Sequence, residues 1–267
     1  MKLLIVTIVL ATLALAQSAE EVEKRIANLP PAQRAYERFR FWRTTHDSGD
    51  YREYLKSRGF TASDIDEQLK LVESEGQRSE IERWNRILTA ATPAFNTKPN
   101  EFLVQMTKDR KSGMALDVGM GQGRNAIWLA QQGWAVTGFD PADKAVALAR
   151  STAAGLGLNL QTEITDTEHF EFGERKWDLI LISYAGGRER RDSIQKALKP
   201  GGVLIIEGFH RDATKGHSIG GAVVFDTGEL PALYPQLRAV RYEEPLAMPD
   251  FGRERSRVVR YCGERPE

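Results

Sequence analysis

One short stretch of the sequence has residue types and spacing suited to ligand binding. Residues 115–125 read ALDVGMGQGRN, so an apolar run meets Asp117 and then three alternating glycines, Gly119, Gly121 and Gly123. Glycines let a backbone turn sharply and approach a ligand without a Cβ in the way. A helix that follows such a turn offers free N–H groups and the positive end of its dipole. A dinucleotide fingerprint would need its third glycine at the position of Arg124, so that fingerprint is absent.

A second acidic residue follows at the distance expected for ribose recognition. Asp140 closes the apolar run in VTGFDPAD, about 20 residues after the glycines. A carboxylate accepts hydrogen bonds from two hydroxyls and repels a 2′-phosphate, so the ligand indicated is a nucleoside without phosphate. The alternative for Asp140 is a simple cap of the helix that begins at PADKAV.

These stretches, in this order, resemble the class I S-adenosylmethionine-dependent methyltransferases. LDVGMGQGRNAIWLA is similar to their first motif, and its continuation to the branch that contains the tellurite-resistance methyltransferases. GFDPAD resembles the ribose-binding motif, EITDTEHF the loop beside the adenine, WDLILISY the fourth strand and LKPGGVLIIEGF the fifth. The resemblance runs from about Gly113 to the C-terminus and implies S-adenosylmethionine as cofactor.

The resemblance assigns a role to each matched position. Asp117 would orient the glycine loop and the amino-acid end of the cofactor, Asp140 would bind the ribose and Asp166 the adenine amino group. Asp166 has a simpler alternative as a turn residue, and Arg124 and Asn125 have one as the first residues of a helix. The cofactor-binding residues predicted in this way are Asp117, Gly119, Gly121, Gly123, Arg124, Asn125, Asp140, Asp166, Thr167 and Ser183.

Methyl transfer from a sulfonium is an in-line displacement that depends mainly on positioning, and it needs a base only when the acceptor must lose a proton. His210, after the fifth strand, and Tyr184, after the fourth, are the candidate catalytic residues. A histidine at a strand end is also a common capping residue. The (N/D)PP(Y/F) element of many amino-methylating enzymes is replaced by Ser183, Tyr184 and Ala185, which favours a small-molecule acceptor.

Composition narrows the choice of partners. Lysine plus arginine and aspartate plus glutamate are both 37, so no global charge indicates nucleic acid. Cys262 is the only cysteine and the four histidines lack zinc-ligand spacing, so no metal site is predicted. Two other functions stay open: an exported binding module that holds a nucleoside without turnover, and a nicotinamide-dependent oxidoreductase, against which the missing fingerprint counts.

The pattern from residue 101 onward predicts an α/β domain over 101–267. Short apolar runs alternate with amphipathic helices, which indicates a Rossmann-like, mostly parallel sheet of seven strands with helices on both faces. The predicted strands are 114–118, 135–139, 160–165, 177–183, 203–208, 237–242 and 256–261, and the predicted helices after the first two strands are 124–132 and 142–154.

The region before this domain, residues 17–100, is predicted to be a helical N-terminal extension. Prolines and asparagines in TAATPAFNTKPN, residues 89–100, interrupt its last helix. In related methyltransferases such segments fold over the cofactor as a lid, with Phe95 and Asn96 at its tip here. The alternative is a plain linker.

The first residues predict export. Lys2 precedes an apolar run to Ala16, which ends in Ala14-Leu15-Ala16 before a polar segment, as in a secretory signal cleaved after residue 16. The run is shorter than the roughly 20 residues of a membrane span. We therefore expect a periplasmic or secreted protein without a stable span, or one that keeps residues 1–16 as a weak membrane anchor. Export leaves open how the domain obtains a cofactor made inside the cell.

Overall fold

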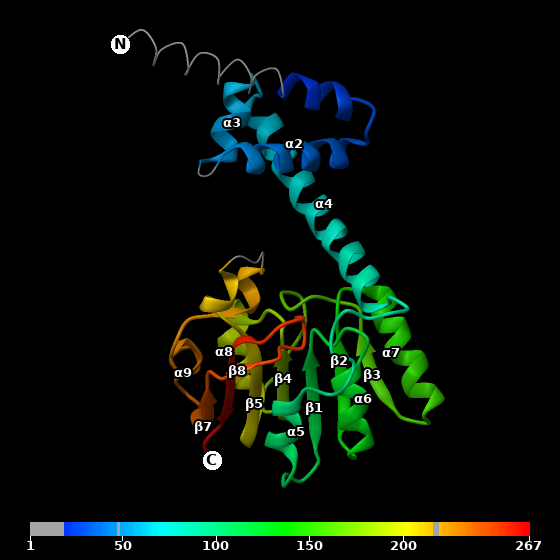
Figure 1. Cartoon of the computed structure of the whole chain (residues 1–267), viewed down its shortest axis with the longest axis vertical. Coiled ribbons are helices and arrows are strands. Elements are labelled where there is room, and N and C mark those ends of the chain that lie inside the picture. Colours follow the sequence, from blue (N-terminus) through cyan, green and yellow to red (C-terminus); the bar gives the residue numbers. More distant parts are fainter. Residues whose placement is uncertain (1–18, 47–48, 216–218) are drawn as a thin grey trace. The chain divides into compact units, whose positions relative to one another are not determined.

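The structure is a computed structural model that describes residues 19–46, 49–215 and 219–267 (Figure 1). The predicted signal sequence lies outside these residues. Contacts divide the chain into two compact units, with the division between Glu82 and Arg83. Residues 83–100, which the sequence analysis assigned to the N-terminal extension, therefore belong to the unit that contains the sheet. No helix in the described ranges has the length and apolar character that crossing a membrane requires.

The first unit is helical, as predicted. Residues 19–26 form a helix, followed by α2 (Pro31–Thr45), α3 (Tyr51–Ser57) and α4 (Ala62–Leu88), which continues into the second unit. Thr61 and Asp64 form a reciprocal capping pair, in which the Thr61 hydroxyl accepts from the Asp64 amide and the Asp64 carboxylate accepts from the Thr61 amide. The apolar side chains at helical spacing pack together in a core of Ala35, Tyr51, Leu55, Ile65 and Val72.

The second unit is built on the predicted sheet. Seven strands follow the order β3-β2-β1-β4-β5-β9-β7, parallel except for β9, which is antiparallel to both β5 and β7. Two short strands, β6 on β5 and β8 on β9, bring the sheet to nine. The strands are β1 (Met114–Val118), β2 (Ala135–Phe139), β3 (Leu160–Glu163), β4 (Trp177–Ser183), β5 (Leu198–His210), β6 (Val224–Phe225), β7 (Arg238–Glu243), β8 (Leu246–Ala247) and β9 (Ser256–Glu264).

Helices cover both faces of this sheet. Successive strand residues point to opposite sides, so each strand contributes side chains to a core on either face. Leu179 and Leu181 of β4 pack in one core with Phe102 and Leu129, which lie on helices α5 and α6. The intervening residues of β4 pack in the other core, with side chains from α8 and α9. The helices of this unit are α5 (Glu101–Thr107), α6 (Arg124–Gln131), α7 (Asp143–Gly155), α8 (Arg191–Ala197) and α9 (Glu229–Leu233), with single 3-10 turns η1 (Arg188–Arg190), η2 (Arg211–Thr214) and η3 (Gly221–Val223).

The parallel register brings the carboxyl ends of four strands to one edge of the sheet. Val118 at the end of β1 lies opposite Phe139 of β2 and Ile182 of β4, and Ser183 lies opposite Glu207 of β5. Ligands of open α/β sheets bind at this edge. The residues that follow these strand ends form the candidate site.

Candidate functional site

The loop between β1 and α6 requires its glycines. Gly119, Gly121 and Gly123 have φ values of 65°, 55° and 80°, in the left-handed region that L side chains rarely adopt. Space is also limited: a Cβ on Gly119 would lie 2.6 Å from the Cβ of Ala185, and one on Gly123 would lie 2.9 Å from the Cβ of Ala149. The loop therefore runs in close contact with the segment after β4 and with α7, and its N–H groups lead into α6.

Asp117 presents an unsatisfied acceptor beneath this loop. Asp117 is 2% exposed, and among the described residues its Oδ2 has no hydrogen-bond partner. Burial raises the pKa of the Asp117 carboxyl to about 7, the Arg124 guanidinium opposes the rise, and the Asp140 carboxylate adds to it. Buried polar atoms are nearly always paired in native proteins. The Oδ2 atom of Asp117 can therefore accept a hydrogen bond from a ligand, and a cationic donor would favour the ionised form of this carboxyl.

Asp140 ties the glycine loop to the start of α7. Its Oδ2 accepts from the Gly121 amide at 2.9 Å, and its Oδ1 accepts from the Ala142 amide at 2.8 Å. Burial raises the pKa of this carboxyl, and the two backbone N–H groups counter the rise. Each carboxylate oxygen has a second lone pair, so Asp140 keeps the capacity to accept from two hydroxyls of a ligand.

The end of α4 and the segment after it cover the glycine loop. The Cδ2 of Leu88 lies 3.2 Å from the position that a Cβ on Gly121 would take. Leu88 and Phe95 pack with Ala142 and Ala145 at the start of α7, and the ring of Phe95 stacks on Phe251 with centroids 5.2 Å apart. The end of α4 therefore contacts the glycine loop through Leu88, and Phe95 packs beside Leu88 against the start of α7 and Phe251.

Arg124 joins three segments rather than only beginning a helix. Its NH2 atom lies 2.6 Å from Oδ2 of Asp250, and both side chains are 7% exposed. The same guanidinium donates to the Lys98 carbonyl oxygen at 2.9 Å and to the Ser183 hydroxyl at 3.3 Å. The neighbouring Asn125 accepts from the Asn100 amide through its Oδ1 at 2.8 Å. The segment before α5, the end of β4 and the loop before β9 thus meet at the start of α6.

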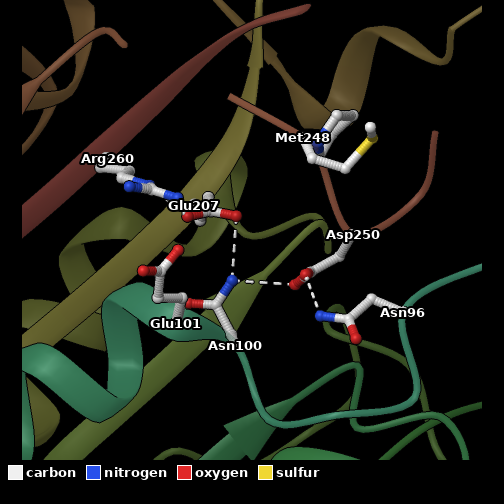
Figure 2. Close-up of a pocket in the computed structure, with 8 residues that line it drawn as sticks. Asn96, Asn100, Glu101, Glu207, Met248, Asp250 and Arg260 are labelled. Carbon is white, nitrogen blue, oxygen red and sulfur yellow. Dashed lines mark hydrogen bonds and ion pairs between the residues drawn. The ribbon is translucent and has the colours of Figure 1, made fainter. Parts of the chain in front are cut away.

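A cavity of about 210 Å³ lies beside this junction (Figure 2). Across it, Asn100 Nδ2 donates to Glu207 Oε1 at 2.9 Å and to Asp250 Oδ2 at 2.8 Å. Arg260 Nε donates to the other oxygen of Glu207 at 2.6 Å. The residues that line the cavity are Asn96, Asn100, Glu101, Glu207, Met248, Pro249, Asp250 and Arg260.

Burial raises the pKa of the Glu207 carboxyl. The guanidinium of Arg260 opposes this rise, and the carboxylate of Asp250 reinforces it. Because two carboxylates share one small site, Glu207 holds a proton more readily than an exposed glutamate does. The cavity therefore has a proton-accepting group in its wall.

Tyr184 donates a hydrogen bond to the Glu207 carboxylate. It is a non-glycine residue with a φ of 55°, and its hydroxyl donates to Glu207 Oε1 at 2.9 Å. Burial, together with the carboxylates of Glu207 and Asp250, raises the pKa of the Tyr184 phenol far above its usual value. Tyr184 therefore remains protonated and orients Glu207. Strained backbone of this kind often marks functional sites.

The other predicted residues lie apart from the cavity lining. His210 is buried at the start of η2, where its Nδ1 accepts from the Asp212 amide at 3.0 Å and its Nε2 lies 2.9 Å from the Thr227 hydroxyl. This is the capping arrangement that the sequence analysis left as the alternative. Asp166 pairs with His169 at 2.7 Å in the loop after β3, next to Thr167, whose carbonyl oxygen accepts from Arg190.

Four residues of the site were missed by the sequence analysis: Asn100, Glu207, Asp250 and Arg260. A signal exists for Glu207, because it is the one charged residue in the apolar run from Val203 to Phe209. Asp250 and Asn100 carry no such signal, since the contacts that define them join residues 150 positions apart in the chain. No metal-binding group of three or more His, Cys, Asp or Glu side chains occurs in the described parts of the chain.

The glycine loop and its two carboxylates fit one kind of ligand. Asp117 offers an unpaired acceptor for a cationic amino group, Asp140 offers lone pairs for two hydroxyls, and the glycines let the loop backbone approach a ligand closely. A nucleoside with an attached amino acid satisfies all three.

Comparison with known proteins finds similarity to methyltransferases. Residues 115–202 match the family described as "Methyltransferase domain". The ribosomal RNA small subunit methyltransferase C of Alcanivorax borkumensis is 27% identical over 155 residues, which are 49% of this chain and 47% of that protein. The 2-heptyl-1-hydroxyquinolin-4(1H)-one methyltransferase of Mycobacteroides abscessus is 30% identical over 135 residues, 47% of this chain and 60% of that one. The chain therefore spans about half to three fifths of these curated relatives.

Solved structures show the same fold. TehB from Haemophilus influenzae superposes with a TM-score of 0.52 at 20% identity, over 62% of each chain. The N-methyltransferase NodS from Bradyrhizobium japonicum WM9, in complex with S-adenosyl-L-homocysteine, superposes with a TM-score of 0.53 at 20% identity, over 70% of this chain and 98% of that one. The strand order and the glycine loop are thus those of a methyltransferase fold.

Proposed function

We propose that this chain, which carries a class I S-adenosylmethionine-dependent methyltransferase domain, transfers a methyl group from S-adenosylmethionine to a small-molecule acceptor. The observation that carries the proposal is the arrangement around the glycine loop. Asp117, near the end of β1, has a buried oxygen with no partner among the described residues, and Asp140, just after β2, accepts from the amide of Gly121. The family match over residues 115–202 supports the same activity.

The cofactor supplies an electrophilic methyl group on a positively charged sulfur. The chain's own residues would hold it by three kinds of contact: Asp117 with the amino group, Asp140 with the ribose hydroxyls, and the N–H groups at the start of α6 with the carboxylate. Ser183 at the end of β4 and Arg124 at the start of α6, which contact each other, would face the reacting methyl group. Asp166 and Thr167 would border the adenine, as the resemblance implies.

A small acceptor is favoured over nucleic acid. The chain has equal numbers of basic and acidic residues, 37 of each, so it lacks the positive surplus with which proteins bind a phosphate backbone. The cavity of about 210 Å³ beside Arg124 suits a small molecule. One relative is named for ribosomal RNA and another for a hydroxyquinolone, so an assay must include RNA as well as small acceptors.

Residues 84–100 form the lid of this site in our proposal. The segment is held by the contact of Leu88 with Gly121 and by the stacking of Phe95 on Phe251. It is also held by two hydrogen bonds of 2.8 Å, from the backbone amide of Asn96 to the carbonyl oxygen of Asp250 and from Asn96 Nδ2 to Asp250 Oδ1. A cofactor that reaches Gly121 must displace Leu88. The lid therefore opens before binding and closes on the bound cofactor.

The activity is tested by following S-adenosyl-L-homocysteine release with S-adenosylmethionine and panels of small amines, phenols, N-hydroxy heterocycles, thiols and 16S ribosomal RNA. The proposal predicts release with a small acceptor and none with RNA beyond the background. Release with RNA, and with none of the small molecules, would show that the acceptor is a nucleic acid. Tight cofactor binding without release on any panel would favour the binding module that the sequence left open.

Export is a separate proposal that concerns residues 1–16. The basic start, the apolar run and Ala14-Leu15-Ala16 support cleavage after Ala16. N-terminal sequencing of the protein recovered from its native host tests it. A mature chain that begins at Gln17 is expected, whereas an intact N-terminus in a membrane fraction would indicate a retained anchor, and an intact soluble chain would contradict export.

A further inference from the structure

We infer that the cavity lined by Glu207 is the acceptor subsite and that Glu207 takes the acceptor's proton, so that the acceptor is a small molecule with a transferable N–H or O–H proton. The inference rests on the proposed methyl transfer and names the class of its acceptor. It comes from the side chains that line the cavity and from their position relative to the glycine loop.

The position of the cavity places it next to the cofactor site. Glu207 lies opposite Ser183 in the register of β5 with β4. Arg124, the first residue of α6, contacts both Ser183 and the Asp250 carboxylate, and that carboxylate lines the cavity. A molecule in the cavity therefore lies one layer of side chains from the end of β4, toward which the methyl group would point.

Hydrogen bonds leave Glu207 with unused acceptor capacity. Among the described residues, its Oε1 accepts two hydrogen bonds, from Tyr184 and Asn100, whereas its Oε2 accepts one, from Arg260. An ionised carboxylate oxygen has two lone pairs. One position on Oε2 is thus open to a donor from the cavity, and an acceptor's N–H or O–H is such a donor.

Glu207 is better suited to take a proton than its neighbours. The Tyr184 phenol is already protonated and donates to Glu207, and both are buried. The Asp250 carboxylate already accepts hydrogen bonds from the side chains of Arg124, Asn96 and Asn100. Burial and the nearby Asp250 carboxylate raise the pKa of Glu207 despite the Arg260 guanidinium, so Glu207 takes up a proton more readily than an exposed glutamate does.

Charged groups lie near Glu207 on the elements packed against it, and of these the Arg260 guanidinium and the Asp250 carboxylate shift its pKa. Arg260 of β9 contacts it and also contacts Glu243 of β7, at 3.3 Å. Asp250, paired with Arg124 of α6, approaches it through Asn100, and Glu101 of α5 lies at the cavity lining. Since the base must be ionised to act, the rate rises with pH through the pKa of Glu207 and then levels.

Methyl transfer to such an acceptor moves one methyl group and one proton. The acceptor's lone pair forms a bond to the methyl carbon while the carbon–sulfur bond breaks and its electron pair stays on sulfur. The proton that the acceptor carried on the attacking nitrogen or oxygen goes to Oε2 of Glu207, which later releases it to water. An acceptor that attacks as a preformed anion, such as hydrosulfide, has no need of this proton transfer.

The experiment compares the full-length wild type with Glu207→Gln, Glu207→Asp and the matched control Glu243→Gln, which removes the other carboxylate on Arg260 and is not itself a residue of the cavity lining. Three quantities are measured: affinity for S-adenosyl-L-homocysteine, methyl transfer to protic acceptors (an aliphatic amine, a phenol and an N-hydroxy heterocycle) and to hydrosulfide, and the titration of Glu207 by carboxyl ¹³C NMR. The Glu207→Gln spectrum assigns the Glu207 signal.

We expect Glu207→Gln to bind S-adenosyl-L-homocysteine within twofold of the wild type and to lose about 100-fold or more of transfer to protic acceptors, the usual contribution of a general base. Transfer to hydrosulfide, where present, stays within threefold. Glu207→Asp retains part of the rate, and Glu243→Gln retains nearly all of it. In the wild type the Glu207 signal titrates at a higher pH than the signals of exposed glutamates.

Two results would overturn the inference. One is a Glu207→Gln variant that binds S-adenosyl-L-homocysteine and methylates protic acceptors as fast as Glu243→Gln. The other is a Glu207 signal that titrates with the exposed glutamates, whatever the turnover. Failure of the proposed function has a different signature: the wild type binds S-adenosyl-L-homocysteine and methylates none of the acceptors, while Glu207 still titrates high.

Discussion

Leu88 packs against Gly121 of the glycine loop. Its Cδ2 lies 3.2 Å from the position of a Cβ on Gly121, at the end of α4, with Phe95 and the start of α7 around it. The apolar contacts of this side chain stabilise the closed arrangement of the free protein. Any ligand that reaches the glycine loop must compete with them.

Replacement of Leu88 by alanine should strengthen cofactor binding. Full burial of a leucine side chain contributes about 1.5–3 kcal/mol, and loss of that contribution in the closed state should lower the Kd for S-adenosyl-L-homocysteine by roughly tenfold. Ile87→Ala, one residue away at the edge of the same cluster, is the control and should change the Kd little. Calorimetric titration measures both; weaker binding by Leu88→Ala would show that Leu88 packs on the cofactor instead.

Cofactor affinity should depend on pH through Asp117. Its pKa of about 7 in the free protein is raised by burial, and the cationic amino group of the ligand would lower it, so binding releases a proton. Affinity for S-adenosyl-L-homocysteine should therefore rise roughly tenfold per pH unit below 7 and level above it. Asp117→Asn should flatten the profile between pH 5.5 and 8, and a pH-independent Kd in the wild type would contradict this role.

The Asp117 carboxyl should make the protein less stable as pH rises, whereas it should make cofactor binding stronger. A carboxyl whose pKa is raised on folding binds its proton more tightly in the folded chain, so the free energy of unfolding falls as pH rises from about 4 to 7. Asp117→Asn should remove part of this decline. Urea unfolding of the free protein at pH 5 and pH 7 measures it, and an equal decline in wild type and variant would count against the raised pKa.

The strands of the central sheet were predictable from sequence because local features bound them. Strands β1, β2 and β4 begin and end at the predicted residues, each an apolar run bounded by glycine or polar residues. The fifth strand was predicted over 203–208 but runs from Leu198 to His210, because Leu198 pairs with Trp177 across an irregular register and Phe209 and His210 pair with β6. Such pairings depend on distant residues and leave no local signal.

The residues of the candidate site also include some that local sequence features indicate and some that they do not. The positions of Asp117, Asp140 and Ser183 follow from strand ends that meet at one edge of a parallel sheet, so sequence spacing was enough to predict them. Asp250 and Asn100 enter the site through contacts with residues far away in the chain. The sequence placed His210 after a strand over 203–208, whereas it is the last residue of β5, and its ring contacts Thr227, which no pattern revealed.

The contacts of His210 predict a structural role that a variant can separate from catalysis. Its Nδ1 accepts from the Asp212 amide, so His210→Ala removes the cap of η2 and should lower the free energy of unfolding by about 1 kcal/mol. Affinity for S-adenosyl-L-homocysteine should remain unchanged. A variant of normal stability that has lost methyl transfer would restore His210 as the base that the sequence suggested.

The buried pair of Arg124 and Asp250 should show strong coupling. Arg124→Met leaves the Asp250 carboxylate buried without its cation and should destabilise the protein by about 3–5 kcal/mol. The double variant Arg124→Met with Asp250→Asn should recover much of that loss, because no uncompensated charge remains. Denaturant unfolding of the four proteins of this cycle gives the coupling, and strictly additive effects would show that the two side chains act independently.

Binding of S-adenosylmethionine to the wild type and to Asp140→Ala and Asp140→Asn, followed by calorimetric titration, is the most direct test of the central claim. The account predicts micromolar binding by the wild type and loss of most of the affinity in both variants, with circular dichroism showing that all three are folded. Folded wild type that fails to bind S-adenosylmethionine, or an Asp140→Ala variant that binds it as tightly as the wild type does, would contradict the assignment of this site.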